Sequence, residues 1–246
     1  MKNINIGKLF RLTITVLWVI LFGRLLSRDY FIEKLEIRET QAIQRGIEES
    51  YMGIYFQKER IGYVKIHLVN NKTDVITLNQ EAVMNLNILD KSYPIKMDLS
   101  AELNDSSLLK KFNFNLFSPF YELHASGKVI GNEVHYRMNT GKNQTSNIIT
   151  LSEAPFIPTH MRSYLLHNDL IEGEKYKIPY FDPVTMSGQE SIIEYKGFKK
   201  EFIREKGRIY KLHHFIESIS GMRIDFYLDE EGNVIKETSP AGFVFY

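Results

Sequence analysis

Only a few residues of this chain have the types and spacing that chemistry would need. His124 and Ser126 are two positions apart, so on a strand they lie on one face, as a hydrolytic serine and its base would. Neither a G-x-S-x-G nor an S-x-x-K motif appears in a context that activates a serine. The chain contains no cysteine, which excludes thiol nucleophiles, thiolate zinc sites and disulfides. The sequence therefore predicts no catalytic residue, and we expect a protein that is not an enzyme.

The histidines and acidic residues are also not spaced to hold a metal ion. His213 and His214 are adjacent, so on a strand they point to opposite faces. His160 and His167 are two helical turns apart, beyond the i, i+4 spacing of zinc-binding helices. Residues 229–233, Asp-Glu-Glu-Gly-Asn, lack the alternating oxygen ligands of a calcium loop and predict a hairpin turn. Since no glycine-rich phosphate loop occurs either, we predict no metal site, no cofactor-binding residue and no cofactor.

The overall composition limits the classes of partner. Lys+Arg 31 against Asp+Glu 30 gives a formal net charge of +1, so no basic excess attracts a nucleic acid. Phe 16 and Tyr 14 are the notable excess, and such residues suit either half-buried pleated surfaces or an apolar cavity. We therefore expect no nucleic-acid partner, and we expect a lipid or a protein partner.

The segment 9–26, LFRLTITVLWVILFGRLL, is the strongest indication of location. Its apolar core, residues 12–23, carries no charge and lies between Arg11 and Arg24. A helix of this length spans about 18 Å, which is short of the ~30 Å hydrocarbon core of a bilayer. The helix becomes long enough if flanking apolar residues extend it and the arginines snorkel their charges to the interfaces. We therefore predict an uncleaved signal anchor, a membrane helix, within residues 1–28.

Two alternatives stay open for this segment, a cleaved signal peptide and a buried soluble helix. Cleavage needs a pattern of small residues after the apolar run, and residues 24–28, Arg-Leu-Leu-Ser-Arg, offer no such pattern. Lysine and arginine are nearly balanced on the two sides of the segment, so the positive-inside rule does not fix its orientation. A short basic region before one apolar run is the layout of an export signal. We predict a single-pass protein of the bacterial inner membrane with its C-terminal domain in the periplasm.

The rest of the chain is predicted to be mainly β. Residues 29–50 are charge-rich and predict a stalk, or alternatively a helix packed on the domain. Over 51–246 apolar and polar residues alternate, and turn signals recur about every 8–12 residues, as in sandwiches and barrels. Residues 90–94, which end in proline, are expected to separate two strands, and 159–168 to form one short helix. The predicted fold is an antiparallel curved sheet or half-barrel behind an N-terminal membrane helix.

The β domain contains a weak internal repeat. Residues 97–105 and 222–230 each form a predicted strand that ends in Leu-Asx, followed by a tight turn and an apolar pair before a lysine. Two related halves, 51–151 and 170–246, would explain the repeat. Convergent hairpin chemistry explains it equally well, so both interpretations stay open.

Three short motifs occur in order along the domain. They are EESYMGIY at 48–55 with ERIGY at 59–63, GEKYKIPYFDP at 173–183, and LDEEGNVIKETSPAG at 228–242. In this order they resemble the β domain of bacterial membrane-anchored transglutaminase-like proteins. The resemblance implies a β-rich envelope domain of the half-barrel kind found in periplasmic lipid carriers. The Cys-His-Asp triad of that family is not carried over, because the chain has no cysteine.

The functional hypothesis follows from the predicted curved sheet. A concave sheet rich in tyrosine and phenylalanine would enclose an apolar pocket. We therefore expect a membrane-anchored, extracytoplasmic binding or scaffold protein of the bacterial envelope, for an apolar ligand or a partner protein. The alternatives are an accessory subunit of an envelope transporter or transglutaminase-like system, and an envelope hydrolase. The candidate pocket residues, all of which are also expected to serve as ordinary core, are Tyr63, Phe112, Phe114, Tyr136 and Phe226.

Overall fold

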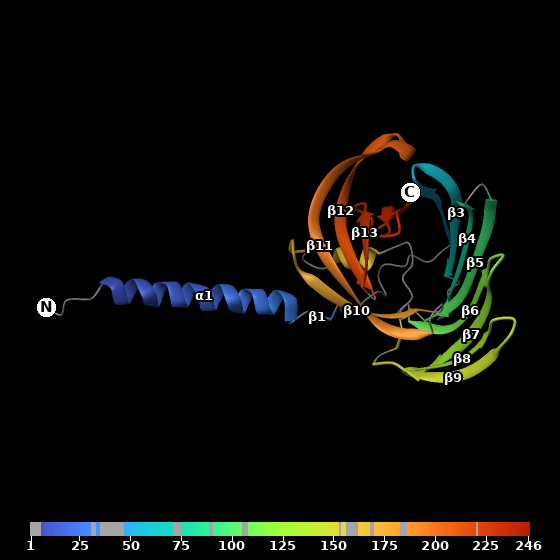
Figure 1. Ribbon diagram of the computed structural model, residues 1–246, viewed down its shortest axis with the longest axis horizontal. Coiled ribbons are helices and arrows are strands. Elements are labelled where there is room, and N and C mark those ends of the chain that lie inside the picture. Colours follow the sequence, from blue (N-terminus) through green and yellow to red (C-terminus); the bar gives the residue numbers. More distant parts are fainter. Residues whose placement is uncertain are drawn as a thin grey trace.

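A computed structural model describes the chain as one helix and one large sheet (Figure 1). The described residues are 6–30, 33–34, 47–70, 75–88, 91–104, 108–152, 154–155, 162–167, 170–182, 186–219 and 221–246. The elements are α1 (Ile6–Tyr30), β1 (Glu33–Lys34), β2 (Ile47–Phe56), β3 (Glu59–Asn70), β4 (Ile76–Ile88), β5 (Lys91–Leu103), β6 (Leu109–Phe117), β7 (Glu122–Ile130), β8 (Glu133–Asn139), β9 (Gln144–Thr150), η2 (Ser163–His167), β10 (Lys175–Asp182), β11 (Ser187–Ile203), η3 (Arg204–Lys206), β12 (Arg208–Ile219), β13 (Met222–Leu228), β14 (Val234–Thr238) and β15 (Phe243–Phe245).

In the described part of the chain, the strands form a single 15-stranded sheet. Its order is β1-β10-β11-β12-β13-β14-β15-β2-β3-β4-β5-β6-β7-β8-β9. Strands β2 to β9 and β10 to β15 are two antiparallel meanders, and the pairing of β15 with β2 joins them. The sheet curves so that the two meanders face each other, and it does not close between its edges, β1 and β9 (Figure 1). The predicted mainly β, antiparallel curved sheet is therefore confirmed.

Strands β6 and β7 show how alternation builds the interior. Phe112 and Phe114 are buried on β6, while Asn113 between them is exposed. Leu123 continues the buried face on β7. The ring of Phe112 lies 5.2 Å from the ring of Phe181 on β10, centroid to centroid. Since Phe181 belongs to the other meander, both meanders contribute to one core.

Two glycines allow unusually close packing. A Cβ at Gly62 on β3 would overlap the backbone carbonyl oxygen of Val83 on β4. A Cβ at Gly127 on β7 would lie 2.5 Å from a ring carbon of Phe112. Glycine at a strand interior marks such close approaches, so both residues are required by the packing around them.

The break between two strands is shorter than the sequence predicts. Strand β5 begins at Lys91 and passes through Pro94, which pairs with Asn85 of β4. On its other side, β5 pairs with β6 only from Lys96 onward. Pro94 therefore lies where one side of the strand is unpaired, and the missing N–H of proline is tolerated there.

The short helix predicted over 159–168 is described only in part. Residues 163–167 form η2, a 3-10 helix, while 159–161 and 168 lie outside the described residues. The connection around η2 contributes Tyr164 and Leu165 to the buried core. It therefore occupies part of the space between the two meanders.

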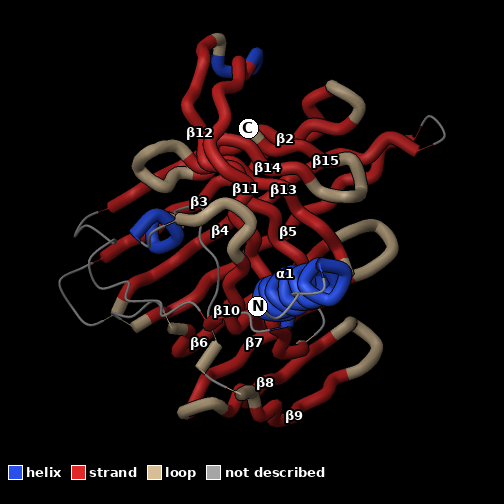
Figure 2. Tube along the Cα trace, turned by 90° about the vertical axis from the view of Figure 1, so that its left-hand side faces the viewer, coloured by secondary structure: helices blue, strands red, loops and turns tan. Residues whose placement is uncertain are grey.

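The segment predicted as an anchor forms the helix α1, which extends away from the sheet (Figures 1 and 2). The side chains of residues 13–25 are exposed, and most of them are apolar. The rings of Trp18 and Phe22 stack with their centroids 5.0 Å apart. No helix among the described residues is both long and apolar enough to cross a membrane. The helix itself is confirmed, and its insertion into a membrane stays a prediction.

Candidate functional site

An apolar cavity of about 270 Å³ lies on the concave face of the sheet, against β2 to β5, β14 and β15. Its polar groups come from Gln80, Glu237 and Arg162, the last of which precedes η2. Its wall along β2 to β5 consists mainly of aliphatic and thioether side chains. These are Met52, Ile54, Val64, Ile66, Ala82, Met84 and Met97.

The register of the strands sets this wall. Met52 pairs with Val64, Val64 with Ala82, and Ala82 with Met97, so these four side chains form a row across β2 to β5. Three of them are buried, and Met97 is half-buried. Methionine is flexible and polarisable, so a wall that contains it adapts to the shape of an apolar ligand.

Arg162 places a guanidinium group in the interior. Its Nη1 donates to Glu217 Oε2 at 2.8 Å, and its Nη2 lies 3.5 Å from Glu237 Oε2. The hydroxyl of Ser191 donates to the other oxygen of Glu217 at 2.5 Å. The guanidinium carbon lies 4.1 Å from the centroid of the Phe226 ring, within range of a cation–π interaction. Strands β11 to β14 thus hold the arginine in place from one side of the cavity.

The charges in this cluster are coupled. Although burial opposes the charged form, the carboxylates of Glu217 and Glu237 raise the pKa of Arg162 above its usual value. Burial raises the pKa of Glu237, and the charge of Arg162 only partly offsets this. A quarter of the side-chain surface of Glu237 is accessible, against 9% for Arg162. The cluster is therefore a buried ion pair with a second, less stabilised carboxylate.

Two buried polar atoms near the cavity have no hydrogen-bond partner among the described residues. One is Nε of Arg162 and the other is the hydroxyl oxygen of Ser50. Ser50 lies two positions before Met52 on β2, hence on the same face of the strand. Buried polar groups in folded proteins are usually paired, so these two atoms are exceptions within the packed interior.

The five aromatic residues predicted as pocket or core do not line this cavity. Phe112, Phe114 and Phe226 are buried in the core, and Tyr63 and Tyr136 are half-buried. Phe226 touches the site only through the ring face that contacts the guanidinium of Arg162. Their expected role as ordinary core is confirmed for the three phenylalanines.

The residues that form the site were not identified from the sequence. The position of Glu217 carried a usable signal, because it has the same strand parity as the buried Phe215 and so an acid points inward. Arg162 carried no such signal, since it lies in a connection whose path depends on the folded sheet.

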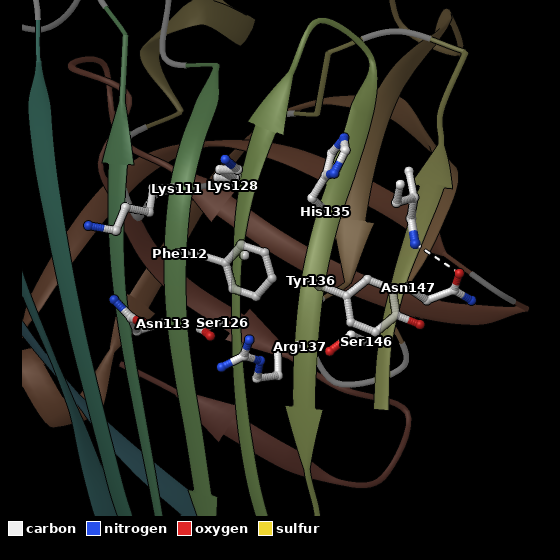
Figure 3. Close-up of a pocket in the computed structure, with 12 residues that line it drawn as sticks. Lys111, Phe112, Asn113, Ser126, Lys128, His135, Tyr136, Arg137, Ser146 and Asn147 are labelled. Carbon is white, nitrogen blue, oxygen red and sulfur yellow. Dashed lines mark hydrogen bonds between the residues drawn. The ribbon is translucent and has the colours of Figure 1, made fainter. Parts of the chain in front are cut away.

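A second, shallower groove of about 590 Å³ runs along β6 to β9 (Figure 3). Lys111, Lys128, His135 and Arg137 contribute positive or titratable groups to it. Lys111 lies 3.4 Å from Glu102, and His135 lies 3.1 Å from Glu133. These side chains are exposed or half-buried, and Phe112, Tyr136 and Ile148 add apolar groups between them. Two of the predicted aromatic candidates, Phe112 and Tyr136, thus line this open groove and not the cavity beside Arg162.

His124 and Ser126 lie on one face of β7, as predicted, without forming a catalytic pair. The ring of His124 contacts Asn115 Oδ1 at 2.8 Å through Nδ1 and Glu122 Oε1 at 2.7 Å through Nε2. Both ring nitrogens are therefore engaged by groups other than the serine.

His213 and His214 point to opposite faces of β12, as predicted. Nδ1 of His213 lies 3.0 Å from the hydroxyl of Tyr195, and burial lowers the pKa of His213. Nε2 of His214 lies 2.8 Å from Asp225 on the other face. Within the described ranges, no three His, Cys, Asp or Glu side chains gather closely enough to hold a metal ion, and His160 lies outside those ranges.

Residues 229–233 form the hairpin turn that the sequence predicts. Oδ1 of Asp229 accepts hydrogen bonds from the backbone N–H groups of Glu231 and Asn233 at 3.0 and 2.8 Å. Gly232 has a positive φ of 88°, which suits glycine in such a turn. The acidic side chains thus build the link between β13 and β14.

Comparison with known proteins supports the fold alone. The chain is similar to a crystal structure described as a beta-barrel-like protein of a domain of unknown function, DUF1849, from Brucella abortus. The match has a TM-score of 0.55 and 11% sequence identity, and it covers 82% of this chain and 95% of that chain. No family model matches the sequence, and no curated protein matches it.

Proposed function

We propose that this chain is a membrane-tethered, extracytoplasmic domain of the bacterial envelope that binds an apolar ligand in the cavity beside Arg162. The observation that carries the proposal is the cavity itself, a concave apolar wall with a few converging polar groups. Small-molecule sites in proteins have this composition. Apolar surface left facing water forfeits about 25 cal/mol per Å², so a ligand that covers this wall binds favourably.

The tether is proposed from α1. Its described apolar side chains, such as Leu17, Trp18 and Ile20, are each more than half exposed. A helix that is apolar on all sides is typical of a membrane environment. The layout of a short basic region before one apolar run supports an N-inside orientation, which would place the domain in the periplasm.

Binding is favoured over hydrolysis because the two acids of the site are already engaged. Glu217 accepts hydrogen bonds from both Arg162 and Ser191, and Glu237 faces the same guanidinium. A glycosidase needs two carboxylates that are free to act on a bond between them. The cluster therefore serves better as a fixed polar wall than as an acid–base pair.

The experiment that tests the proposal fills the cavity. Ala82 is buried on its wall, so Ala82→Phe would place a ring in the ligand space. We expect the purified full-length protein to carry a bound lipid-type molecule in native mass spectrometry, and Ala82→Phe to lose it while its melting temperature is kept. Ala241→Phe, the same change in the exposed turn before β15, should retain the ligand. A wild-type protein without any bound apolar molecule, or equal loading of Ala82→Phe, would reject the proposal.

A further inference from the structure

The far end of the β11–β12 hairpin extends beyond the neighbouring strands of the sheet. Strand β10 pairs with β11 only up to Glu194, and β13 pairs with β12 only from His213 onward. Residues 198–212 therefore hold a two-stranded ribbon with which no third strand pairs among the described residues, and η3 closes its tip. Figure 2 shows this tip at the top of the molecule. The ribbon is thus placed where a partner outside the sheet can reach it.

The two faces of this ribbon differ in their packing. On one face, Ile203 and Leu212 are 1% and 0% exposed and belong to a small apolar cluster. On the other face, Phe198, Phe202 and Ile209 are 51%, 60% and 70% exposed. Phe202 pairs with Ile209, so their side chains are neighbours across the ribbon. Exposed apolar side chains that gather on one face and are rimmed by polar residues are typical of an interaction site.

The same end of the hairpin is strongly basic. Residues 196–211 contain seven lysine and arginine residues and two glutamates. One of these acids, Glu201, is already engaged by two lysines. Lys200, Arg204 and Lys206 are exposed, and in the described ranges of the chain none of their side chains has an acidic partner. The ribbon therefore presents an excess of positive charge around its exposed apolar face.

An anionic lipid bilayer offers both kinds of contact that this surface lacks. Amphipathic elements that lie on membranes bury their apolar side chains about 5–10 Å into the boundary between headgroups and acyl chains. Lysine and arginine beside such side chains are attracted to anionic headgroups. An acidic peptide would pair with the cations but would leave the rings of the exposed face without an apolar environment. Charge and apolar surface together therefore favour the bilayer.

We infer that the tip of the β11–β12 hairpin docks on an anionic lipid bilayer. Phe202 and Ile209 insert at the headgroup boundary, while Lys200, Arg204 and Lys206 contact the headgroups. None of these residues lines the apolar cavity on the concave face, so the docking does not depend on a ligand there. Together with α1, the tip gives the domain a second contact with the membrane.

The test places a fluorescent label on the tip of the full-length protein. The chain has no cysteine, so Ile209→Cys carries a single bimane label. The protein is mixed with vesicles of brominated phosphatidylglycerol or brominated phosphatidylcholine. We expect the bromine atoms to quench the label at least about fivefold more strongly in phosphatidylglycerol, where the label should also be protected from acrylamide in the water. Phe120→Cys, at a side chain that is 76% exposed, is the control position and should stay open to acrylamide in both.

A pair of double variants of the labelled protein tests the role of charge. Arg204→Gln with Lys206→Gln removes two cations of the tip, so docking on phosphatidylglycerol should weaken about fivefold for each charge. Salt at about 0.5 M should weaken docking of the unaltered tip as well, because it screens exposed charges. Lys128→Gln with Arg137→Gln is the matched control, since it removes two exposed cations from the groove along β6 to β9. It should leave the quenching unchanged.

Three results would contradict the docking. The first is a label at residue 209 that acrylamide reaches as freely as the label at 120 on phosphatidylglycerol vesicles. The second is equal insertion into both lipids, or an equal loss in both double variants, which would exclude the role of the cations. The third is protection of the label at 209 without any vesicles, which would show that a second copy of the chain covers this face.

Discussion

At the scale of single residues, Arg162 links three strands in the interior. It joins Glu217 of β12, Glu237 of β14 and the ring of Phe226 on β13. A buried ion pair is weak evidence for stability, because desolvation offsets the attraction between the charges. What the geometry shows is which elements the arginine joins, namely the connection before η2 and strands β12 to β14.

The raised pKa of Glu237 predicts a pH dependence of stability. Its folded-state pKa lies above the ordinary value of 4.5, so between these two pKa values the folded protein binds more protons than the unfolded chain. This contribution to stability is fully present below pH 4.5 and is lost as the pH rises through the folded-state pKa. In urea unfolding, we expect the free energy of unfolding of Glu237→Gln, relative to wild type, to increase from acid to neutral pH.

Glu201→Gln provides the opposite sign as a control. Although burial alone would raise it, the ammonium groups of Lys236 and Lys199 lower the pKa of Glu201. The stability from Glu201 is therefore present above pH 4.5 and lost as the pH falls through the folded-state pKa, so this variant should be less stable than wild type at neutral pH. If both variants changed with pH in the same direction, the assignment of Glu237 as a destabilised carboxylate would be wrong.

At the scale of elements, the formation of α1 depends on its own segment, whereas the extent of a strand also depends on its neighbours. The helix forms where an uninterrupted apolar segment predicts it, because helical hydrogen bonds are local. Strand β5 runs through Pro94 although the local pattern predicts a break there. Its partner β4 continues to pair with it, and this pairing is a property of two segments together.

The single tryptophan of the chain makes the insertion of α1 measurable. Trp18 lies on α1 and is 61% exposed, so its fluorescence reports on this helix alone. With the full-length protein in lipid vesicles, we expect blue-shifted emission that brominated lipids quench. Leu17→Arg places a charge near the middle of the segment at a cost of roughly 2.5–3.5 kcal/mol, so it should reduce the membrane-bound fraction.

Leu25→Arg is the matched control, because a charge near the end of the helix can snorkel to the interface. It should leave the membrane-bound fraction and the emission of Trp18 nearly unchanged. Emission typical of water in the presence of vesicles would show that the helix does not insert.

At the scale of the whole molecule, the two meanders form one sheet and share one core. The pairing of β15 with β2 joins them at the backbone, and Phe112 and Phe181 join them across the interior. The possible halves 51–151 and 170–246 are therefore continuous in structure, whatever their origin. A shared core favours cooperative unfolding of the entire sheet.

We expect a single unfolding transition for the β domain, with equal calorimetric and van't Hoff enthalpies. Phe181→Ala removes a fully buried ring from the shared core, so it should lower the stability by about 3–5 kcal/mol and shift the whole transition. Phe120→Ala, at a side chain that is 76% exposed, should change the stability by less than about 0.5 kcal/mol. Two transitions, of which only one shifts in Phe181→Ala, would contradict the shared core.

The sequence by itself determined the features that depend on neighbouring residues. These are the helix over the apolar N-terminal segment, the alternation that makes the rest mainly β, the turn at 229–233, and the opposite directions of His213 and His214. Each follows from a local period or a local hydrogen bond, which a single segment contains.

Only the tertiary structure decided where the site lies. Arg162, Glu217 and Glu237 are far apart in the sequence, and their contacts exist because the curved sheet brings β12, β14 and the connection before η2 together. The aromatic residues that the composition highlighted fill the core, whereas the cavity is lined by Met52, Met97 and their neighbours. The curvature of the whole sheet decides which inward-facing residues pack against others and which line the cavity. No local sequence pattern encodes this curvature.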